Sequence, residues 1–344
     1  MTMCHRLVCR ALALWVIGER AIAATSAQHA LRPAGPQAQS IADLWSLMLA
    51  VCTFVLVAVV GTMLLAVARR RRADATTPPD VERLDRGEPR ARAVVTVAVG
   101  VSALLLVVLL VASIVTDRAI ARMPLQDGLH IEVTGKQWWW DVRYDDADPS
   151  RVFTTANEIH VPVGRPVVLT LRSPDVIHSF WVPSLHGKKD LIPGQTVTFT
   201  LRADVAGVYR GQCAEFCGYQ HARMGMLVIA DPPDVFEQWA DAQRKPAAPP
   251  ADDTAQRGHD VFMATTCAMC HAIAGTQAAA RAGPDLTHVA SRTTIAAVTL
   301  PNNAAYLAAW IDDPHAFKPG TTMPAHALDG QDRNALVTYL TTLK

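Results

Sequence analysis

The stretch GQCAEFCGYQHARMGM, residues 211–226, places two cysteines, a histidine and a methionine in one short run. Cys213 and Cys217 are followed by His221 and Met224. A disulfide between the cysteines would leave the imidazole and the thioether without a role. A structural zinc site uses Cys and His ligands and has no use for a thioether. Copper binds soft thiolate and thioether ligands together with imidazole, so the run predicts a copper site.

The second cysteine distinguishes this run from a mononuclear blue-copper site, which uses two histidines, one cysteine and a weak axial methionine. Two thiolates that bridge two copper ions would use both cysteines. A further histidine has to come from another segment, and residues 173–194, SPDVIHSFWVPSLHGKKDLIPG, offer His178 and His186. We expect His186, beside Lys188 and Lys189, to be a surface-loop histidine and not a ligand.

Short runs rich in Val, Ile and Thr surround the copper motif, and Gly and Pro separate them. In one of these runs Val197, Phe199 and Leu201 alternate with threonines. Period-two alternation with frequent turns predicts an antiparallel β sandwich or barrel, which we place at residues 128–240. The copper motif then lies in a loop between two strands of this domain.

Two uncharged apolar runs, residues 44–68 and 94–115, precede the β domain. Each exceeds the ~20 residues that cross the hydrocarbon core as a helix, so we predict a transmembrane hairpin in the lipid bilayer over residues 40–118. The loop between the runs carries arginine at both ends, and the positive-inside rule places it in the cytoplasm. Everything after Asp117 then faces the periplasmic side of a bacterial cytoplasmic membrane. The net charge of +1 gives no indication of nucleic-acid binding.

Residues 1–30 resemble a degraded export signal, because Arg6 and Arg10 precede an apolar run and small residues follow it. Glu19 and Arg20 interrupt this pattern, so cleavage and retention of the segment both stay open. The segment precedes the first span and therefore belongs to the same side of the membrane as the β domain.

A proline- and alanine-rich stretch, RKPAAPPADD, predicts an exposed, semi-stiff linker at residues 241–254. The following domain, residues 255–344, contains Cys267, Cys270 and His271 in the pattern C-x-x-C-H, which attaches a c-type haem. A thioredoxin-like pair is the alternative, but it is expected in a βαβ context, and the surrounding sequence is helical and alanine-rich. We therefore predict one covalently bound haem with the histidine beneath its iron.

The opposite side of the haem needs a second ligand, and the run KPGTTMP supplies Met323. Met269 is too close to the attachment site to reach that side. Ligation by histidine and methionine raises the haem potential. The rival ligands are the other histidines of the domain: His259, His288, His315 and His326.

His178 together with CAEFCGYQHARM resembles the binuclear copper (CuA) domain of cytochrome c oxidase subunit II. Members of that family carry a two-helix membrane hairpin before a cupredoxin sandwich. The resemblance implies that Cys213 and Cys217 bridge two copper ions. It also implies that His178 and His221 bind one copper ion each at the two ends of the site.

The same resemblance implies two weaker copper ligands, the thioether of Met224 and the backbone carbonyl of Glu215. The carboxylate of Glu215 would reach a magnesium or manganese ion shared with oxidase subunit I. In the family motif G-x-Q-W-x-W, Trp138 corresponds to the tryptophan through which electrons reach the copper. The alternative for the Trp138–Trp140 run is an aromatic belt at the membrane interface.

Several aspartates follow the tryptophans, and two interpretations of them stay open. They form an acidic patch that steers a basic cytochrome c, or they form a solvated polar turn. The residues are Asp141, Asp145, Asp146 and Asp148.

The KPGTTMP run and GPDLTHVASR, residues 283–292, resemble all-α, class I-like cytochromes c. The whole chain thus resembles an oxidase subunit II with a fused cytochrome c. This implies that it accepts electrons through its haem from cytochrome c or a cytochrome bc complex. It would pass them through CuA to subunit I, where O2 is reduced and protons are translocated, with subunit III as a further partner. The alternative is the equivalent subunit of a CuA-containing nitric oxide reductase.

One position departs from the family pattern. Many members carry a glutamate near the start of the second span that feeds a proton path in subunit I. Here Arg92 stands at the matching position, and Glu88 is nearby but displaced. We hypothesise that Glu88 takes over the proton-path role.

Overall fold

The computed structural model describes residues 28–69, 76, 89–122 and 128–344. The chain divides into two compact units: residues up to Ala38 together with those from Pro124 onward form one, and Gln39–Met123 form the other. Glu88 and nearly all of the candidate export signal lie outside the described residues, so both hypotheses about them remain predictions.

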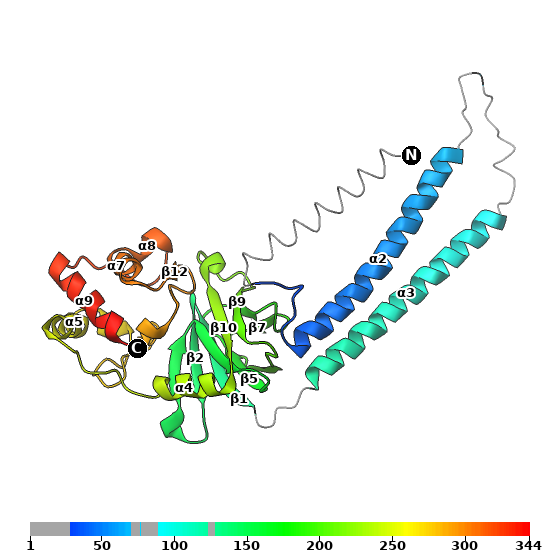
Figure 1. The fold of residues 1–344 in the computed structure, drawn as a ribbon. Coiled ribbons are helices and arrows are strands. Elements are labelled where there is room, and N and C mark those ends of the chain that lie inside the picture. Colours follow the sequence, from blue (N-terminus) through cyan, green and yellow to red (C-terminus); the bar gives the residue numbers. More distant parts are fainter. Residues whose placement is uncertain (1–27, 70–75, 77–88, 123–127) are drawn as a thin grey trace, which may run out of the picture. The chain divides into compact units, whose positions relative to one another are not determined.

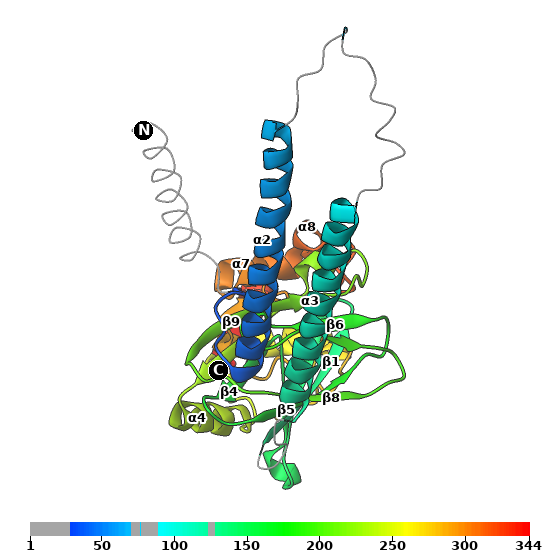
Figure 2. The same ribbon diagram turned by 90° about the vertical axis from the view of Figure 1, so that its right-hand side faces the viewer.

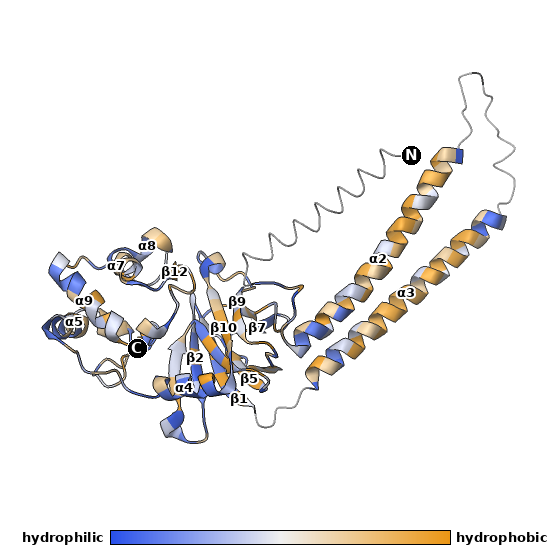
Figure 3. Cartoon of the chain, in the orientation of Figure 1, coloured by the Kyte–Doolittle hydropathy of each residue, from blue (hydrophilic) through white to orange (hydrophobic). Residues whose placement is uncertain are grey.

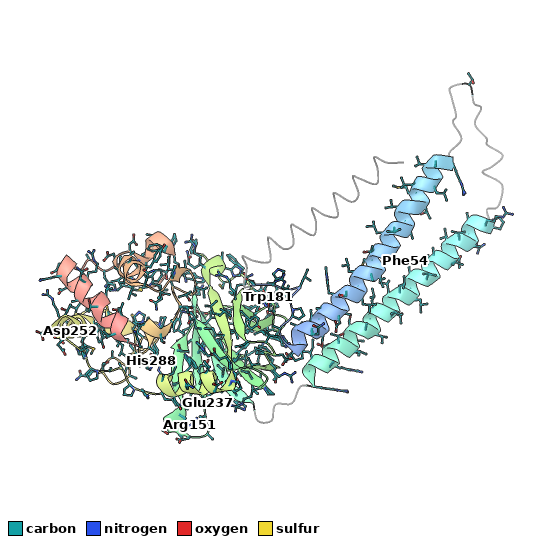
Figure 4. The ribbon with its side chains drawn as sticks, viewed as in Figure 1. Phe54, Arg151, Trp181, Glu237, Asp252 and His288 are labelled. Atoms are coloured by element: carbon teal, nitrogen blue, oxygen red, sulfur yellow. The ribbon has the colours of Figure 1, made fainter. Side chains whose placement is uncertain are left out.

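The smaller unit consists of two long helices, α2 (Pro36–Arg69) and α3 (Pro89–Ala121), which run in opposite directions (Figures 1 and 2). Both are long and apolar enough to cross a membrane. Figure 3 shows apolar residues along almost the whole of each helix. Many of their large apolar side chains are exposed, such as that of Phe54 at 66% (Figure 4). This confirms the prediction of two apolar N-terminal helices.

Two five-stranded sheets form the β domain. The first has the order β3-β2-β1-β5-β8, with β1 (Leu129–Lys136), β2 (Trp139–Asp145), β3 (Phe153–Ala156), β5 (Val167–Arg172) and β8 (Val197–Leu201). The second has the order β4-β10-β9-β6-β7, with β4 (Glu158–Pro162), β6 (His178–Trp181), β7 (Lys189–Leu191), β9 (Gly207–Cys213) and β10 (Gly225–Asp231). The predicted β sandwich is confirmed.

The strand directions differ in part from the sequence prediction. β1 pairs with β5 in parallel, and β10 pairs with β4 in parallel; the other pairs in these sheets are antiparallel. The chain passes from the first sheet to the second between β3 and β4, and it returns with β5. The period-two pattern reports which side chains face the core and carries no information on strand direction, so it could not reveal these parallel pairs.

The core between the sheets contains two of the three tryptophans of the aromatic run. Trp140 is fully buried, and Trp138 is 7% exposed within the same core cluster. Trp140 packs edge-on against Phe180 and against the ring of His178. These two tryptophans are therefore part of the β domain's interior and do not form a membrane-interface belt.

The C-terminal domain is helical, with α5 (Asp253–Ala264), α6 (Cys267–Cys270), α7 (Ala304–Asp312), α8 (Pro314–Phe317) and α9 (Gly330–Thr342), and a small pair of strands, β11 (Thr294–Ile295) and β12 (Leu300–Pro301). Asp252 caps α5 by accepting from the amide of Ala255 (Figure 4). Helix α4 (Pro233–Gln243) precedes the linker and was not identified from sequence. The predicted all-α cytochrome-like domain is confirmed.

Candidate functional site

The loop between β9 and β10 carries the copper motif. Cys213 is the last residue of β9, and Met224 directly precedes β10. The amide of Cys213 donates to the carbonyl of Met224 at 2.9 Å, which closes the loop. The neighbouring strand β6 begins with His178, and its Phe180 pairs with Cys213. The sheet thus brings a distant imidazole beside the two cysteines.

All six predicted donor groups lie in one cluster. Cys213 Sγ lies 3.7 Å from Cys217 Sγ, 3.8 Å from His178 Nδ1 and 3.2 Å from the carbonyl oxygen of Glu215. Cys217 Sγ lies 3.7 Å from His221 Nδ1 and 3.8 Å from Met224 Sδ. Each cysteine therefore has its own imidazole and its own weaker donor, an arrangement that suits two metal ions held between two shared sulfurs.

The electrostatics of the two thiols fit a cationic occupant. The hydrogen bond from Cys217 lowers the pKa of the Cys213 thiol, and the same hydrogen bond, together with burial, raises the pKa of Cys217. Two buried thiolates at this separation repel each other unless positive charge lies between them. The donor set therefore fits copper, since soft thiolate and thioether ligands with imidazole select that metal.

Asp175 is a site residue that sequence reasoning missed. Its Oδ1 lies 2.8 Å from Nε2 of His178, and its Oδ2 accepts from the amide of Gln137 at 2.7 Å. A carboxylate accepts, so Nε2 carries the proton and Nδ1 points its lone pair toward the cysteines. The sequence offered one signal for this role, which is an acidic residue three positions before the predicted ligand His178.

His186 is not the surface histidine that we expected. It is 5% exposed, and its ring packs edge-on against Phe199 at 4.9 Å. Burial lowers the pKa of its imidazole to about 4. The adjacent lysines suggested exposure, and Lys188 is indeed exposed, but the histidine turns into the core. His186 is absent from the described His/Cys cluster around the copper motif.

The acidic residues after the tryptophans are paired within the domain. Asp141 pairs with Lys136, Asp145 with Arg143 and Asp146 with Arg151, while Asp148 caps a short helix. This pairing disfavours a steering patch. Asp146 and Asp148 lie in the polar connection after β2, whereas Asp141 and Asp145 lie within that strand. Glu215 also has a partner, since its carboxylate lies 3.1 Å from Lys188 Nζ.

A cavity of about 500 Å³ lies beside the C-x-x-C-H motif, and Cys267, Cys270, His271 and Met323 all line it. His271 donates from Nδ1 to the carbonyl of Pro284 at 2.7 Å, and burial lowers the pKa of its imidazole. Its Nε2 is therefore left with a free lone pair, as an axial iron ligand requires.

A second feature of this cavity fits a haem. Arg292 lines it, and its buried Nε has no hydrogen-bond partner in the described part of the chain. An orphaned guanidinium nitrogen beside an apolar cavity suits a carboxylate of the bound group. The residues present thus fit a covalently attached haem held by the two cysteines and His271.

The rival axial ligands are placed as follows. Met269 is 72% exposed and does not line the cavity. His288 is buried (Figure 4), with its ring nitrogens facing the carbonyls of Lys245 and Lys344. His326 lines the cavity as Met323 does, whereas His259 and His315 are not among its lining residues. Met323 and His326 are therefore the candidates that the structure leaves.

Trp138 connects the two sites. Its Nε1 donates to the carbonyl of Cys217 at 2.9 Å, inside the copper loop. Its side chain also lines the cavity that holds the C-x-x-C-H motif. One tryptophan thus touches the backbone of a predicted copper ligand and the wall of the predicted haem site.

The two external domains correspond to two known families. Residues 146–231 match the family described as "Cytochrome C oxidase subunit II, periplasmic domain", and residues 255–344 match "Cytochrome c". The fold and the site therefore define a class of chain in which a cupredoxin-like copper domain is joined to a c-type cytochrome domain.

The similarity to known proteins extends beyond these two domains to nearly the whole chain. The cytochrome c oxidase subunit 2 of Alkalihalophilus pseudofirmus is 37% identical over 92% of this chain and 90% of that protein, and that of Bacillus subtilis is 33% identical over 64% and 63%. The crystal structure of the periplasmic domain of subunit II of cytochrome oxidase from Bradyrhizobium japonicum is 31% identical over 35% of this chain and 96% of that one, with a TM-score of 0.33. This chain belongs to the cytochrome c oxidase subunit 2 family.

The role of Asp175 leads to a prediction about copper binding. Replacing Asp175 with Ala should weaken copper affinity by about 10- to 100-fold, because His178 loses the partner that fixes its ring. Competition of copper between the protein and a chelator of known affinity measures this. Asp234→Ala, on the exposed side of α4, is the control and should bind copper as the unchanged protein does. An Asp175→Ala protein with unaltered affinity would contradict the role.

Proposed function

We propose that this chain is the electron-accepting subunit of a respiratory cytochrome c oxidase. It receives electrons at a covalently bound haem c and passes them through a binuclear CuA centre to the O2-reducing haem–copper site of subunit I. O2 chemistry and proton translocation belong to the complex, and this chain transfers electrons only.

The observation that carries the proposal is the cluster of six donors around Cys213 and Cys217, together with the contact that Trp138 makes with both sites. Copper and haem supply one-electron redox chemistry at these two places. The chain's own residues would hold the copper and the haem. Cys213, Cys217 and Met224 are buried, which excludes water from the copper site. Ligands fixed in this way change little in geometry during electron transfer.

The topology supports a periplasmic location for both external domains. The amide of Ala34 donates to the carbonyl of Ser184, and that of Ala38 donates to the carbonyl of Leu185. The residues that lead into α2 are therefore fixed to the copper domain, and α3 leads into β1. The positive-inside rule predicts that the arginine-rich loop is cytoplasmic, and a chain that crosses the membrane once before and once after this loop has the segments before α2 and after α3 on the periplasmic side.

The proposed partners follow from the site. Phe216, beside the copper ligands, is 77% exposed, as expected for a loop that contacts another subunit. We propose that this face meets subunit I and that subunit III is a further partner in the complex. Glu215 would contribute to a shared magnesium or manganese site after its carboxylate leaves Lys188. An external cytochrome c or a cytochrome bc complex would reduce the haem domain.

The function is tested on the purified complex. Reduced cytochrome c should drive O2 consumption, and Cys217→Ser should reduce this rate by at least about 100-fold because the copper pair loses a bridging ligand. Thr196→Ser, at an exposed position before β8, is the control and should leave the rate unchanged. A complex that consumes nitric oxide but not O2 would overturn the proposal in favour of the reductase alternative.

The distal haem ligand is tested separately. Met323→Leu should lower the haem reduction potential and open the iron to small ligands, because thioether ligation raises the potential. His326→Leu should leave both properties unchanged. Redox titration with optical detection, together with binding of carbon monoxide, measures these effects. Carbon monoxide binding that appears in His326→Leu and not in Met323→Leu would instead assign the distal position to His326.

A further inference from the structure

The copper domain and the C-terminal domain are joined by a buried carboxylate. Glu158, at the start of β4, is 3% exposed. Its Oε1 accepts from the amide and hydroxyl of Thr293 at 2.9 and 2.7 Å, and from those of Thr294 at 2.9 and 3.0 Å. A buried charge is tolerated only where donors satisfy it, and here all of these donors come from the other domain.

A buried lysine of the C-terminal domain makes a second contact with the copper domain. Lys318 is 3% exposed and lies five residues before Met323 in the C-terminal domain. Its Nζ donates to the carbonyl of Trp138 at 2.9 Å and to that of Ala296 at 3.5 Å. Burial lowers its pKa to about 7. A lysine head group removed from water needs such fixed acceptors, so the contact specifies one docked geometry.

Further contacts join the copper loop itself to the same two segments. The amide of Gly225 donates to the carbonyl of Ala297 at 3.2 Å. Gln220 donates to the carbonyl of Pro319, and Arg223 donates to that of Phe317. Segments 293–297 and 317–319 therefore both rest on the copper domain near its predicted ligands.

These contacts close the face that carries Trp138. Trp138 is 7% exposed, and it lines the predicted haem cavity together with Met323 and Lys318. A domain that moved freely on its linker would leave Trp138 accessible to a second protein. The contacts instead hold the predicted haem site and the predicted copper site in one arrangement.

We propose that Glu158 and Lys318 are positioning residues that lock the C-terminal domain over Trp138, so that transfer to the copper site occurs within a fixed complex and external donors reach only the C-terminal domain. The step moves one electron from the reduced haem site to the oxidised copper site, and neither a bond nor a proton is exchanged. The electron-transfer part rests on the proposed function, whereas the lock itself rests on the contacts alone.

The first readout is independent of electron transfer. Amide hydrogen exchange of the full-length chain should show Thr293 and Thr294 protected, and Glu158→Ala should speed their exchange by about tenfold or more, because a charged acceptor is lost. Glu237→Ala, exposed on α4 (Figure 4), is the matched control and should change nothing. Unchanged exchange in Glu158→Ala would overturn the lock.

The second measurement distinguishes a C-terminal domain that is held in one position from one that moves on its linker. After flash photoreduction of the haem in the copper-loaded chain, the rate of copper reduction should not depend on solvent viscosity. In Lys318→Met and in Glu158→Ala the rate should fall as viscosity rises, since domain motion then limits it. Lys344→Met, with an exposed side chain, is the control for Lys318→Met and should behave as the unchanged chain does.

The outcomes distinguish the lock from the proposed function. A viscosity-dependent rate in the unchanged chain would overturn the lock. Protected amides that lose protection in Glu158→Ala, in a chain that shows no transfer between its two sites, would support the lock and overturn the proposed function.

Discussion

The copper domain has to accommodate two thiol groups, those of Cys213 and Cys217, that lie 3.7 Å apart in a buried loop. The arrangement of the residues around them follows from this constraint. Only one of them ionises readily without a cation, because each thiolate disfavours the other. The sandwich resolves this by surrounding the sulfurs with imidazole, thioether and carbonyl donors from strand β6 and from the loop between β9 and β10. β9 ends at Cys213, β10 begins just after Met224, and β6 supplies His178. The sheet pairing that builds the core is thus also what assembles the ligand set.

Hydrogen bonds connect the predicted copper ligands to polar groups outside the cluster. Asp175 holds His178 on one side and the amide of Gln137 on the other. The next residue, Trp138, donates to the copper loop through its ring, and its carbonyl accepts from Lys318. Hydrogen bonds, joined through the backbone of Gln137 and Trp138, therefore lead from a predicted copper ligand to the C-terminal domain. Each of these buried polar groups has few alternative partners. The hydrogen bonds therefore fix the position of the predicted copper site relative to the predicted haem site.

The sequence was most informative where chemistry restricts residue type. The spacing of Cys213, Cys217, His221 and Met224, and the C-x-x-C-H motif, placed the ligand candidates because few other residues can bind these metals. The apolar runs gave the two long helices because nothing else crosses a bilayer as a single segment.

The remaining features depend on tertiary contacts that periodicity does not encode. His186 looked exposed beside two lysines, yet its ring lies in the core against Phe199. The parallel pairing of β1 with β5 arises from the passage of the chain between sheets. Glu158 gave no sequence signal at all, since its donors Thr293 and Thr294 lie more than a hundred residues downstream.

The central claim is that Cys213 and Cys217 hold two copper ions as one redox centre. Electron paramagnetic resonance of the purified, oxidised protein, together with metal analysis, tests it most directly. The account predicts two copper ions in the CuA site per chain and a hyperfine pattern from one unpaired electron shared over two copper nuclei. A single copper ion with the hyperfine pattern of one nucleus would contradict it.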